Sequence, residues 1–317
     1  MDLRQLEYFT HVAELGSFTR AANFLLMTQP VLSRQVRSLE IEFRQVLLER
    51  NGRGVVMTEA GKRLLAHSRS ILGQAARIRS DMEDGRGKAT GRLVVALPPS
   101  VSLALTAPLV RLFRQSFPKA SLCILEGISA YALEWLAIGR VDCAVVYTVA
   151  PSQEIELSPV LSEQLYLISK RSTQHASGKI MDDEPAAWPE VAQCQLILPS
   201  RPHSIRMLLE SSMAEASLRP QVALEIESVP AILNLVRDEG LTAVLSLKAL
   251  CSTGQENEFD ARPIGTPPLQ TTLWVATSAR RPSGQLLKQT VPLLHQVLCD
   301  TWHTPALLAD ETTVAPD

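Results

Sequence analysis

Residues 17–40 read Ser-Phe-Thr-Arg-Ala-Ala-Asn-Phe-Leu-Leu-Met-Thr-Gln-Pro-Val-Leu-Ser-Arg-Gln-Val-Arg-Ser-Leu-Glu, which predicts two helices separated by a short turn. Ser17 can cap the first helix, which ends near Leu25, and Thr28 can cap the second, because such side chains accept hydrogen bonds from helix amides. Pro30 falls in the first turn of the second helix, where a proline costs no hydrogen bond. We interpret the stretch as a helix-turn-helix.

The second helix has two unlike faces at 100° per residue. One face is apolar, with Leu32, Val36, Leu39 and Phe43, and the opposite face carries Pro30, Ser33, Arg34 and Arg37. Arg can pair with guanine and Gln with adenine, and both reach phosphates, so this face, with Gln29 nearby, suits DNA. An ordinary solvated face is the alternative, and it is the commoner case for an isolated stretch.

The flanking residues favour the DNA-binding interpretation. Residues 3–14 predict a further helix that Gly16 ends, and residues 46–57 predict a hairpin around Asn51-Gly52. Arg50 and Arg53 beside its tip could reach a phosphate or the minor groove, although a solvated turn is the alternative. A long helix follows, in which positions 61, 64, 68, 71, 75, 78 and 82 alternate in steps of three and four. This seam predicts a dimerisation arm.

These motifs resemble the LysR-type transcriptional regulators. The resemblance rests on residues 3–9, 16–22, 28–40, 47–50 and 58–61, in order and without gaps. It implies a winged helix-turn-helix whose Gln29, Pro30, Ser33 and Arg34 meet the major groove, with Arg53 on the wing. A departure is Phe43-Arg44, where the family usually has an aliphatic residue and glycine. The full set of expected DNA-binding residues is Thr28, Gln29, Pro30, Ser33, Arg34, Arg37, Arg50 and Arg53.

Charge and composition agree with a DNA-binding module at the amino-terminal end. The chain has 317 residues and a net charge of -2, but residues 1–90 carry 14 Lys/Arg against 10 Asp/Glu, whereas the remainder carries 17 against 23. The basic end suits a polyanion. No signal peptide or apolar membrane-spanning run is present, so we expect a cytoplasmic protein. The five cysteines form no CxxC pair and predict reduced thiols, with a redox switch as the less favoured alternative.

The carboxy-terminal part predicts an α/β domain. Residues 84–91 form a polar, glycine-rich break, after which strand and helix patterns alternate. The pattern resembles the LysR effector domain, itself like a periplasmic binding protein, with two Rossmann-like halves. We expect a DNA-binding domain over 1–58, a linker helix and hinge over 59–90, and an effector domain over 91–303. Its halves are residues 91–160 with 266–303, and residues 161–265; residues 304–317 form a flexible tail.

An effector site is expected at the carboxyl ends of the strands, where helix N-termini offer amides. The hydroxyls of Ser100, Ser102 and Ser129, with the Arg201 guanidinium, could hold a carboxylate or small anion, although each serine alone is more often a helix cap. The expected effector-binding residues are Ser100, Val101, Ser102, Ser129, Pro199, Arg201, Ser228, Val229 and Ser246. Residues 97–102 and 125–129 further resemble the nitrogen assimilation control group within the family.

Other classes of function are weakly supported by the sequence. No metal-ligand spacing of His or Cys, no GxSxG, no GxGxxG after a strand and no Walker loop occurs, so we expect neither an enzyme nor a cofactor. A cytoplasmic solute-binding protein without a DNA-dependent role is the alternative. The favoured hypothesis is a regulator that binds double-stranded promoter DNA and a small-molecule effector. Its expected assembly is a homodimer that forms a homotetramer, with RNA polymerase as a possible partner and no membrane.

Overall fold

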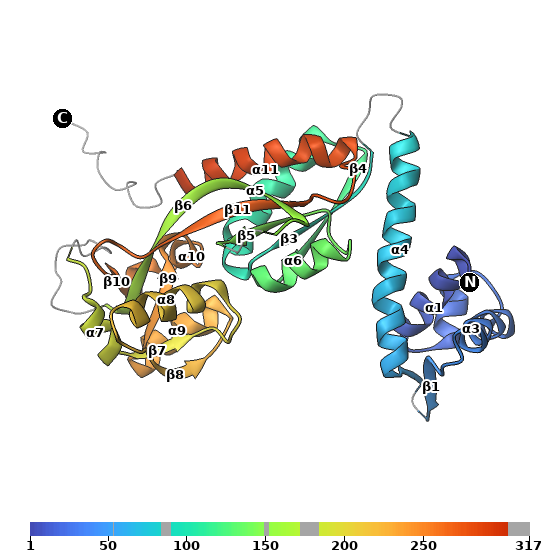
Figure 1. The fold of residues 1–317 in the computed structure, drawn as a ribbon, viewed down its shortest axis with the longest axis horizontal. Coiled ribbons are helices and arrows are strands. Elements are labelled where there is room, and N and C mark those ends of the chain that lie inside the picture. The colour runs from blue at the N-terminus through green and yellow to red at the C-terminus, as the bar shows by residue number, and fades with distance from the viewer. Residues whose placement is uncertain (53, 84–89, 149–151, 172–183, 304–317) are drawn as a thin grey trace, which may run out of the picture. The chain divides into compact units, whose positions relative to one another are not determined.

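The computed structural model describes every residue except 53, 84–89, 149–151, 172–183 and 304–317. Residues 1–88 form one compact unit, and most residues from 89 onward form a second (Figure 1). The expected hinge after residue 83 and the expected tail thus lie outside the described residues, as does Arg53 on the expected wing.

The amino-terminal unit begins with three helices: α1 (Leu3–Leu15), α2 (Phe18–Phe24) and α3 (Gln29–Phe43). Asp2 and Gln5 form a reciprocal capping box on α1. Ser17 accepts a hydrogen bond from the Arg20 amide at 3.3 Å, as the sequence predicts. Thr28 occupies the N-cap position of α3, but its side chain makes no capping hydrogen bond, so that expectation is wrong.

The apolar face of α3 packs as predicted along most of its length. Leu32, Val36 and Leu39 are buried against Phe9 of α1 and its neighbours. The prediction that Phe43 packs with this face is wrong, because 38% of its surface is exposed. Arg44 follows it in the left-handed conformation (φ 51°), so the tight turn forms although no glycine occupies the position.

A two-stranded hairpin follows, with β1 (Leu48–Asn51) antiparallel to β2 (Gly54–Met57). Because Asn51 pairs with Gly54, Asn51 belongs to β1 and not to the turn that the sequence predicts at Asn51-Gly52. The Val55 amide donates to the Gly16 carbonyl at 2.9 Å, which ties the hairpin to the end of α1. A Cβ on Gly54 would lie 2.6 Å from that same carbonyl oxygen, so only glycine fits.

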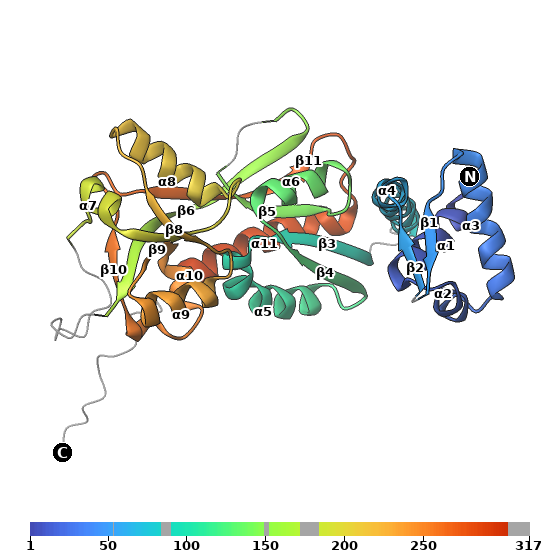
Figure 2. The ribbon, with the colours of Figure 1, turned by 90° about the horizontal axis from the view of Figure 1, so that it is seen from below.

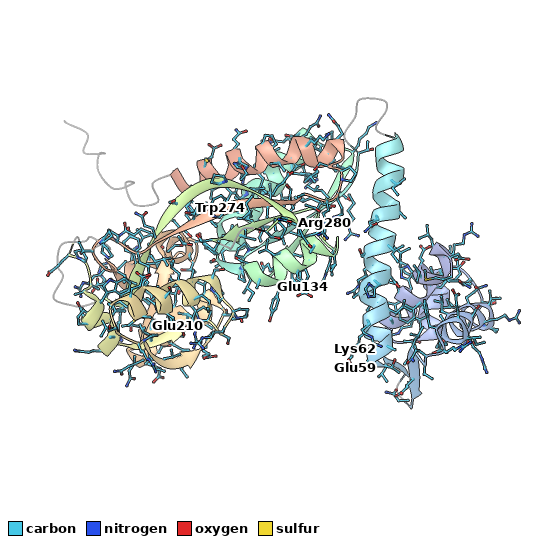
Figure 3. The ribbon with its side chains drawn as sticks, viewed as in Figure 1. Glu59, Lys62, Glu134, Glu210, Trp274 and Arg280 are labelled. Carbon is cyan, nitrogen blue, oxygen red and sulfur yellow. The ribbon has the colours of Figure 1, made fainter. Side chains whose placement is uncertain are left out.

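The long helix α4 (Glu59–Glu83) begins with a Glu59–Lys62 ion pair of 2.6 Å (Figure 3). The first half of its predicted dimerisation seam is not free. Gly61 and Ser68 are buried, and Leu64 packs on the core of the same unit. The small Gly61 permits this close approach, since an added Cβ would overlap the Leu47 carbonyl oxygen. Further along the described part of the seam, Ile71 and Ile78 are exposed.

The second unit is an α/β structure around a nine-stranded mixed sheet. Its first part contains β3 (Gly91–Leu97), α5 (Pro99–Ser116), β4 (Ala120–Glu126), α6 (Ser129–Ala137) and β5 (Cys143–Tyr147). Its second part contains α7 (Trp188–Gln193), β7 (Gln195–Leu198), α8 (Ser204–Glu215), β8 (Gln221–Glu225), α9 (Val229–Glu239), β9 (Thr242–Ser246), α10 (Leu247–Cys251), a 3-10 turn (Glu256–Glu258) and β10 (Phe259–Pro263). In each part the first-named strand lies between two parallel partners.

Two long strands, β6 (Ile155–Lys170) and β11 (Gln270–Ser278), connect the two parts (Figure 1). Residues 155–164 of β6 pair with β11 except for Val160, which is skipped at a register shift, and the last six residues of β6 pair with β9 and β10. The strand-like patterns near residues 158–169 and 265–278 predict these crossing strands, whereas β10, α7 and α10 are not predicted. The sheet order is β4-β3-β5-β11-β6-β9-β7-β8, with β10 beside β6.

Helices cover both faces of the first part. The helices α5 and α11 (Gln285–His303) lie on one face and α6 on the other (Figures 1 and 2). Successive side chains of β3 point to opposite faces of the sheet, so both faces are apolar and need a cover of helices. Val95 and Leu97 join the core on the α5 side, and Ala96 joins the core on the α6 side. The α5-side cluster continues into the second part, where Leu165 and Leu198 belong to it.

Candidate DNA-binding face and effector site

The polar face of α3 is accessible, as a DNA-binding surface requires. Thr28, Pro30, Arg34 and Arg37 are exposed, while Gln29 and Ser33 are half-buried. The buried Leu32, Val36 and Leu39 hold the opposite face on the core. The helix thus presents two guanidinium groups and a first turn of small and polar residues outward. The backbone of Arg50 lies in β1, but its side chain lies outside what the structure describes, as does the whole of Arg53.

Two polar contacts that hold α3 were not predicted. The Gln5 side-chain amide on α1 donates to Gln35 Oε1 at 3.2 Å. Glu40 Oε1 accepts hydrogen bonds from the backbone amides of Leu47 at 2.9 Å and Leu48 at 3.2 Å. These contacts fix α3 to α1 and to the start of the hairpin. The capping box of Asp2 and Gln5 on α1 has a fixed residue spacing, so it could have been recognised in the sequence. The contacts of Glu40 with the Leu47 and Leu48 amides follow no such spacing.

The three serines of the expected effector site are positioned at strand ends, but they have partners within the chain. Ser100 Oγ lies 2.9 Å from the Tyr147 hydroxyl. Ser102 Oγ donates to Glu126 Oε1 at 2.7 Å. Ser129 Oγ is buried and accepts a hydrogen bond from the Tyr147 amide at 3.0 Å. Of the three, Ser102 is already paired with a carboxylate, which makes it a poor anion ligand.

Arg201, the expected cation of this site, is also paired. Its guanidinium contacts Glu210 of α8, which is labelled in Figure 3, at 2.9–3.0 Å. The Arg201 side chain is 65% exposed. The neighbouring Arg206, which was not predicted, is buried and contacts Glu210, Glu225 and the Pro199 carbonyl oxygen at 2.6–3.0 Å. Hydrogen bonding to Glu225 is the main cause that raises the pKa of Arg206. Both arginines therefore bind carboxylates of the chain itself.

The remaining residues of the expected effector site differ in burial and in hydrogen bonding. Val101 is fully buried in the α5-side core and Val229 lies in a second buried cluster, so neither is an exposed wall for a ligand body. Pro199 is also buried. Ser246 Oγ caps α10 by accepting from the Ala249 amide at 3.3 Å. Ser228 is exposed and makes no capping hydrogen bond on α9. Their roles toward an effector stay a prediction.

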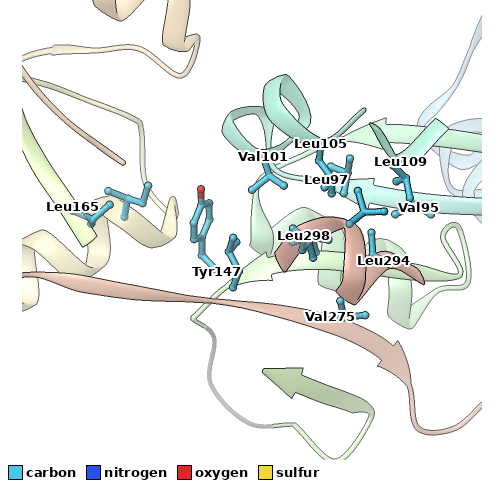
Figure 4. Packing of buried hydrophobic residues seen from close by; sticks show 14 of the residues in the cluster. Val95, Leu97, Val101, Leu105, Leu109, Tyr147, Leu165, Val275, Leu294 and Leu298 are labelled. Carbon is cyan, nitrogen blue, oxygen red and sulfur yellow. The ribbon is translucent and has the colours of Figure 1, made fainter. Parts of the chain in front are cut away.

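A buried polar cluster lies where β6 passes between the two parts, and of its members only Ser246 is among the residues predicted from the sequence. Glu163 Oε2 accepts a hydrogen bond from Trp302 Nε1 of α11 at 2.7 Å. The hydroxyls of Tyr147, at the end of β5, and Ser246, at the end of β9, also lower the pKa of this carboxyl group. Burial raises the Glu163 pKa, although hydrogen bonding from these three side chains lowers it in part. Figure 4 shows Tyr147 between Val101 of the first part and Leu165 of β6.

Neither a metal site nor a membrane span is found among the described residues. Within the part of the chain that the structure describes, no group of three His, Cys, Asp or Glu side chains is arranged to hold a metal ion. Of the helices described, none is both long and apolar enough to cross a membrane.

Comparison with known families identifies the class that this arrangement defines. Residues 3–62 match the bacterial regulatory helix-turn-helix protein, lysR family, and residues 86–298 match the LysR substrate binding domain. The chain therefore belongs to the LysR family of transcriptional regulators, with a DNA-binding and an effector-binding domain.

Individual relatives agree with this assignment. The chain is 32% identical to the nitrogen assimilation regulatory protein nac of Klebsiella aerogenes, over 91% of this chain and 93% of that protein. Its identity to the nac protein of Escherichia coli K12 is 31%, with the same coverage. The predicted resemblance to the nitrogen assimilation control group is thereby confirmed.

Solved structures show the same fold. The crystal structure of CbnR, a LysR family transcriptional regulator, has a TM-score of 0.70 and 23% identity, covering 94% of this chain and 99% of CbnR. Full-length CbnR complexed with its target DNA also gives a TM-score of 0.70, at 24% identity, with 94% and 100% coverage. The two-domain architecture predicted from the sequence is confirmed at this level.

Proposed function

We propose that this protein regulates promoters by inserting α3 into the major groove of DNA, in response to a small molecule bound by its effector domain. The observation that carries the proposal is the two-sided character of α3. Its apolar face is buried on α1, whereas Arg34, Arg37 and Pro30 are exposed beside the half-buried Gln29 and Ser33. An Arg that reads guanine gives sequence preference, and an Arg on phosphate gives affinity that falls steeply with salt.

The hairpin supports the same proposal. Its attachment to Gly16 and Glu40 places β1 and β2 at a defined position next to α3. Arg50 and Arg53 then act as wing contacts to phosphate or the minor groove. The DNA complex of CbnR, which shares this fold, supports DNA as the partner.

Assembly as a dimer belongs to the proposal too. The exposed Ile71 and Ile78 are seven residues apart on one face of α4, which is the spacing of a helix–helix seam. Two copies would present two α3 helices to an inverted repeat. Tetramers form through the effector domains, and RNA polymerase is the further partner through which the bound regulator acts.

The test is binding of the full chain to DNA from upstream of its own gene, measured by fluorescence anisotropy against a shuffled fragment of equal length. We expect at least about a thousandfold preference at physiological salt. Equal affinity for both fragments would instead favour the alternative, a solute-binding protein without a DNA-dependent role. Sedimentation of the complex then gives the number of chains on the DNA.

A further inference from the structure

The chemistry of the expected effector site points away from the anion that the sequence suggests. The inference below rests on the proposed function, because it concerns the ligand of the proposed effector site. Two helices that begin there have prolines in their first turns: Pro99 in α5, preceded by Pro98, and Pro230 in α9. Proline has no amide hydrogen, so these helix N-termini offer fewer donors to an anion than ordinary ones do.

The positive charges near these strand ends are already neutralised. Arg201 pairs with Glu210, and the buried Arg206 pairs with both Glu210 and Glu225. The Ser102 hydroxyl donates its hydrogen to Glu126. An incoming carboxylate would have to share these groups with acidic side chains that they already bind.

The buried cluster at β6 determines whether the Ser100 hydroxyl donates or accepts a hydrogen bond. Trp302 Nε1 can only donate, so Glu163 Oε2 accepts from it. The other oxygen, Oε1, is buried and has no hydrogen bond of ordinary geometry within the described residues, so the carboxylate has acceptor capacity left for the adjacent Tyr147 hydroxyl. Tyr147 carries one hydroxyl hydrogen. When that hydrogen is directed at Glu163, the 2.9 Å contact with Ser100 requires Ser100 to donate to Tyr147.

The half-buried Ser100, in the first turn of α5, is the outermost member of this series of hydrogen bonds. With its hydrogen directed at Tyr147, Ser100 Oγ offers only lone pairs to anything that approaches it. We propose that Ser100 is a ligand-binding acceptor, and that the effector carries an N–H or O–H donor, such as a primary ammonium or a carboxamide, in preference to a carboxylate at this position.

Glu163 controls this preference from a distance, as a positioning residue. In Glu163→Gln the new side-chain NH₂ group can donate to the Tyr147 oxygen, which lets Tyr147 donate to Ser100 and frees the Ser100 hydrogen for a ligand. The substitution keeps the size of the side chain and should reverse the preference from donor to acceptor ligands. A merely structural role of Glu163 would weaken every ligand equally.

The experiment measures thermal unfolding of the full chain at pH 8 and constant ionic strength with n-butylamine, butyramide or butyrate, three probes of matched size. We expect butylamine and butyramide at saturation to raise the Tm by roughly 3 °C, and butyrate to have no effect. Ser100→Ala should abolish the shift. Ser211→Ala, at an exposed serine on α8, should retain it. Glu163→Gln should respond to butyrate in place of butylamine.

Three results would overturn the inference: stabilisation of the wild type by butyrate, an amine shift that persists in Ser100→Ala, or no shift with any of the three probes. Promoter binding measured on the same preparations separates this failure from failure of the proposed function. A chain that prefers its promoter but shows one of these three results remains a DNA-binding regulator with a different ligand chemistry. A chain without promoter preference contradicts the regulator itself.

Discussion

The Glu40 carboxylate of α3 accepts a hydrogen bond from the Leu47 amide at 2.9 Å, and the same oxygen accepts from Leu48. One side chain on the candidate recognition helix thus satisfies two amides at the start of the hairpin strand β1. Since Leu47 is buried, these amides have little access to water. The position of the wing relative to α3 therefore depends on Glu40.

Glu40→Ala should destabilise the amino-terminal unit by about 1–3 kcal/mol, because it leaves partly buried amides without an acceptor. Glu40→Gln should recover most of this loss, since the amide oxygen can still accept. The free energy of unfolding from urea titration measures both variants, and Glu7→Ala on the exposed face of α1 is the control. Equal stability of Glu40→Ala and the control would show that the contact contributes nothing.

Gly61→Ala should also destabilise this unit, by about 1–3 kcal/mol, through overpacking. The added Cβ would overlap the Leu47 carbonyl oxygen, so α4 must shift away from the hairpin. Gly52→Ala is the matched control, because a Cβ at that position meets no atom within 4 Å. Differential scanning calorimetry compares the two, and a Tm for Gly61→Ala at or above that of Gly52→Ala would contradict the packing described for α4.

His203 makes the stability of the effector domain depend on pH. Its Nδ1 accepts a hydrogen bond from the Ile205 amide at the start of α8, and burial lowers its pKa from 6.5 to about 4. The folded pKa lies below the unfolded one, so the contribution is fully present above pH 6.5 and is lost as the pH falls toward 4. The shift corresponds to at most about 3 kcal/mol.

His203→Asn keeps an acceptor for the Ile205 amide but removes the titrating group. We expect the difference in unfolding free energy between wild type and variant to decline steadily from pH 7 to pH 4.5. Urea titrations at four pH values across this range provide the measurement. A difference that does not change with pH would mean that His203 is protonated equally easily in the folded and unfolded chains.

The helices and strands were largely predictable from the sequence because their signals are local. The 3.6-residue spacing of Leu32, Val36 and Leu39 gave the buried face of α3, and that face is confirmed. The end of the helix was less predictable, since the left-handed Arg44 turns the chain and leaves Phe43 partly exposed. Local spacing could not show that α4 packs on its own unit, because Gly61 meets Leu47 through tertiary structure alone.

The effector site was predicted as a set of positions, but its chemistry depends on distant partners. Ser100 and Ser129 both contact Tyr147, but Ser100 does so at the hydroxyl and Ser129 at the backbone amide. No pattern in the sequence associates Glu163 with Trp302, which is 139 residues further along the chain. Long-range pairs of this kind decide whether a hydroxyl donates or accepts.

Arg34→Ala tests most directly whether α3 reads DNA through its exposed arginines. We expect the variant to lose about 1–3 kcal/mol of binding to the upstream fragment while its affinity for shuffled DNA changes little. Arg111→Ala, at an exposed arginine on α5, should behave as wild type. Anisotropy titrations at one fixed salt concentration give all the affinities needed. A uniform loss on both fragments would mean that Arg34 contacts only phosphate, and unchanged affinity on both would contradict the assignment of α3 as the recognition helix.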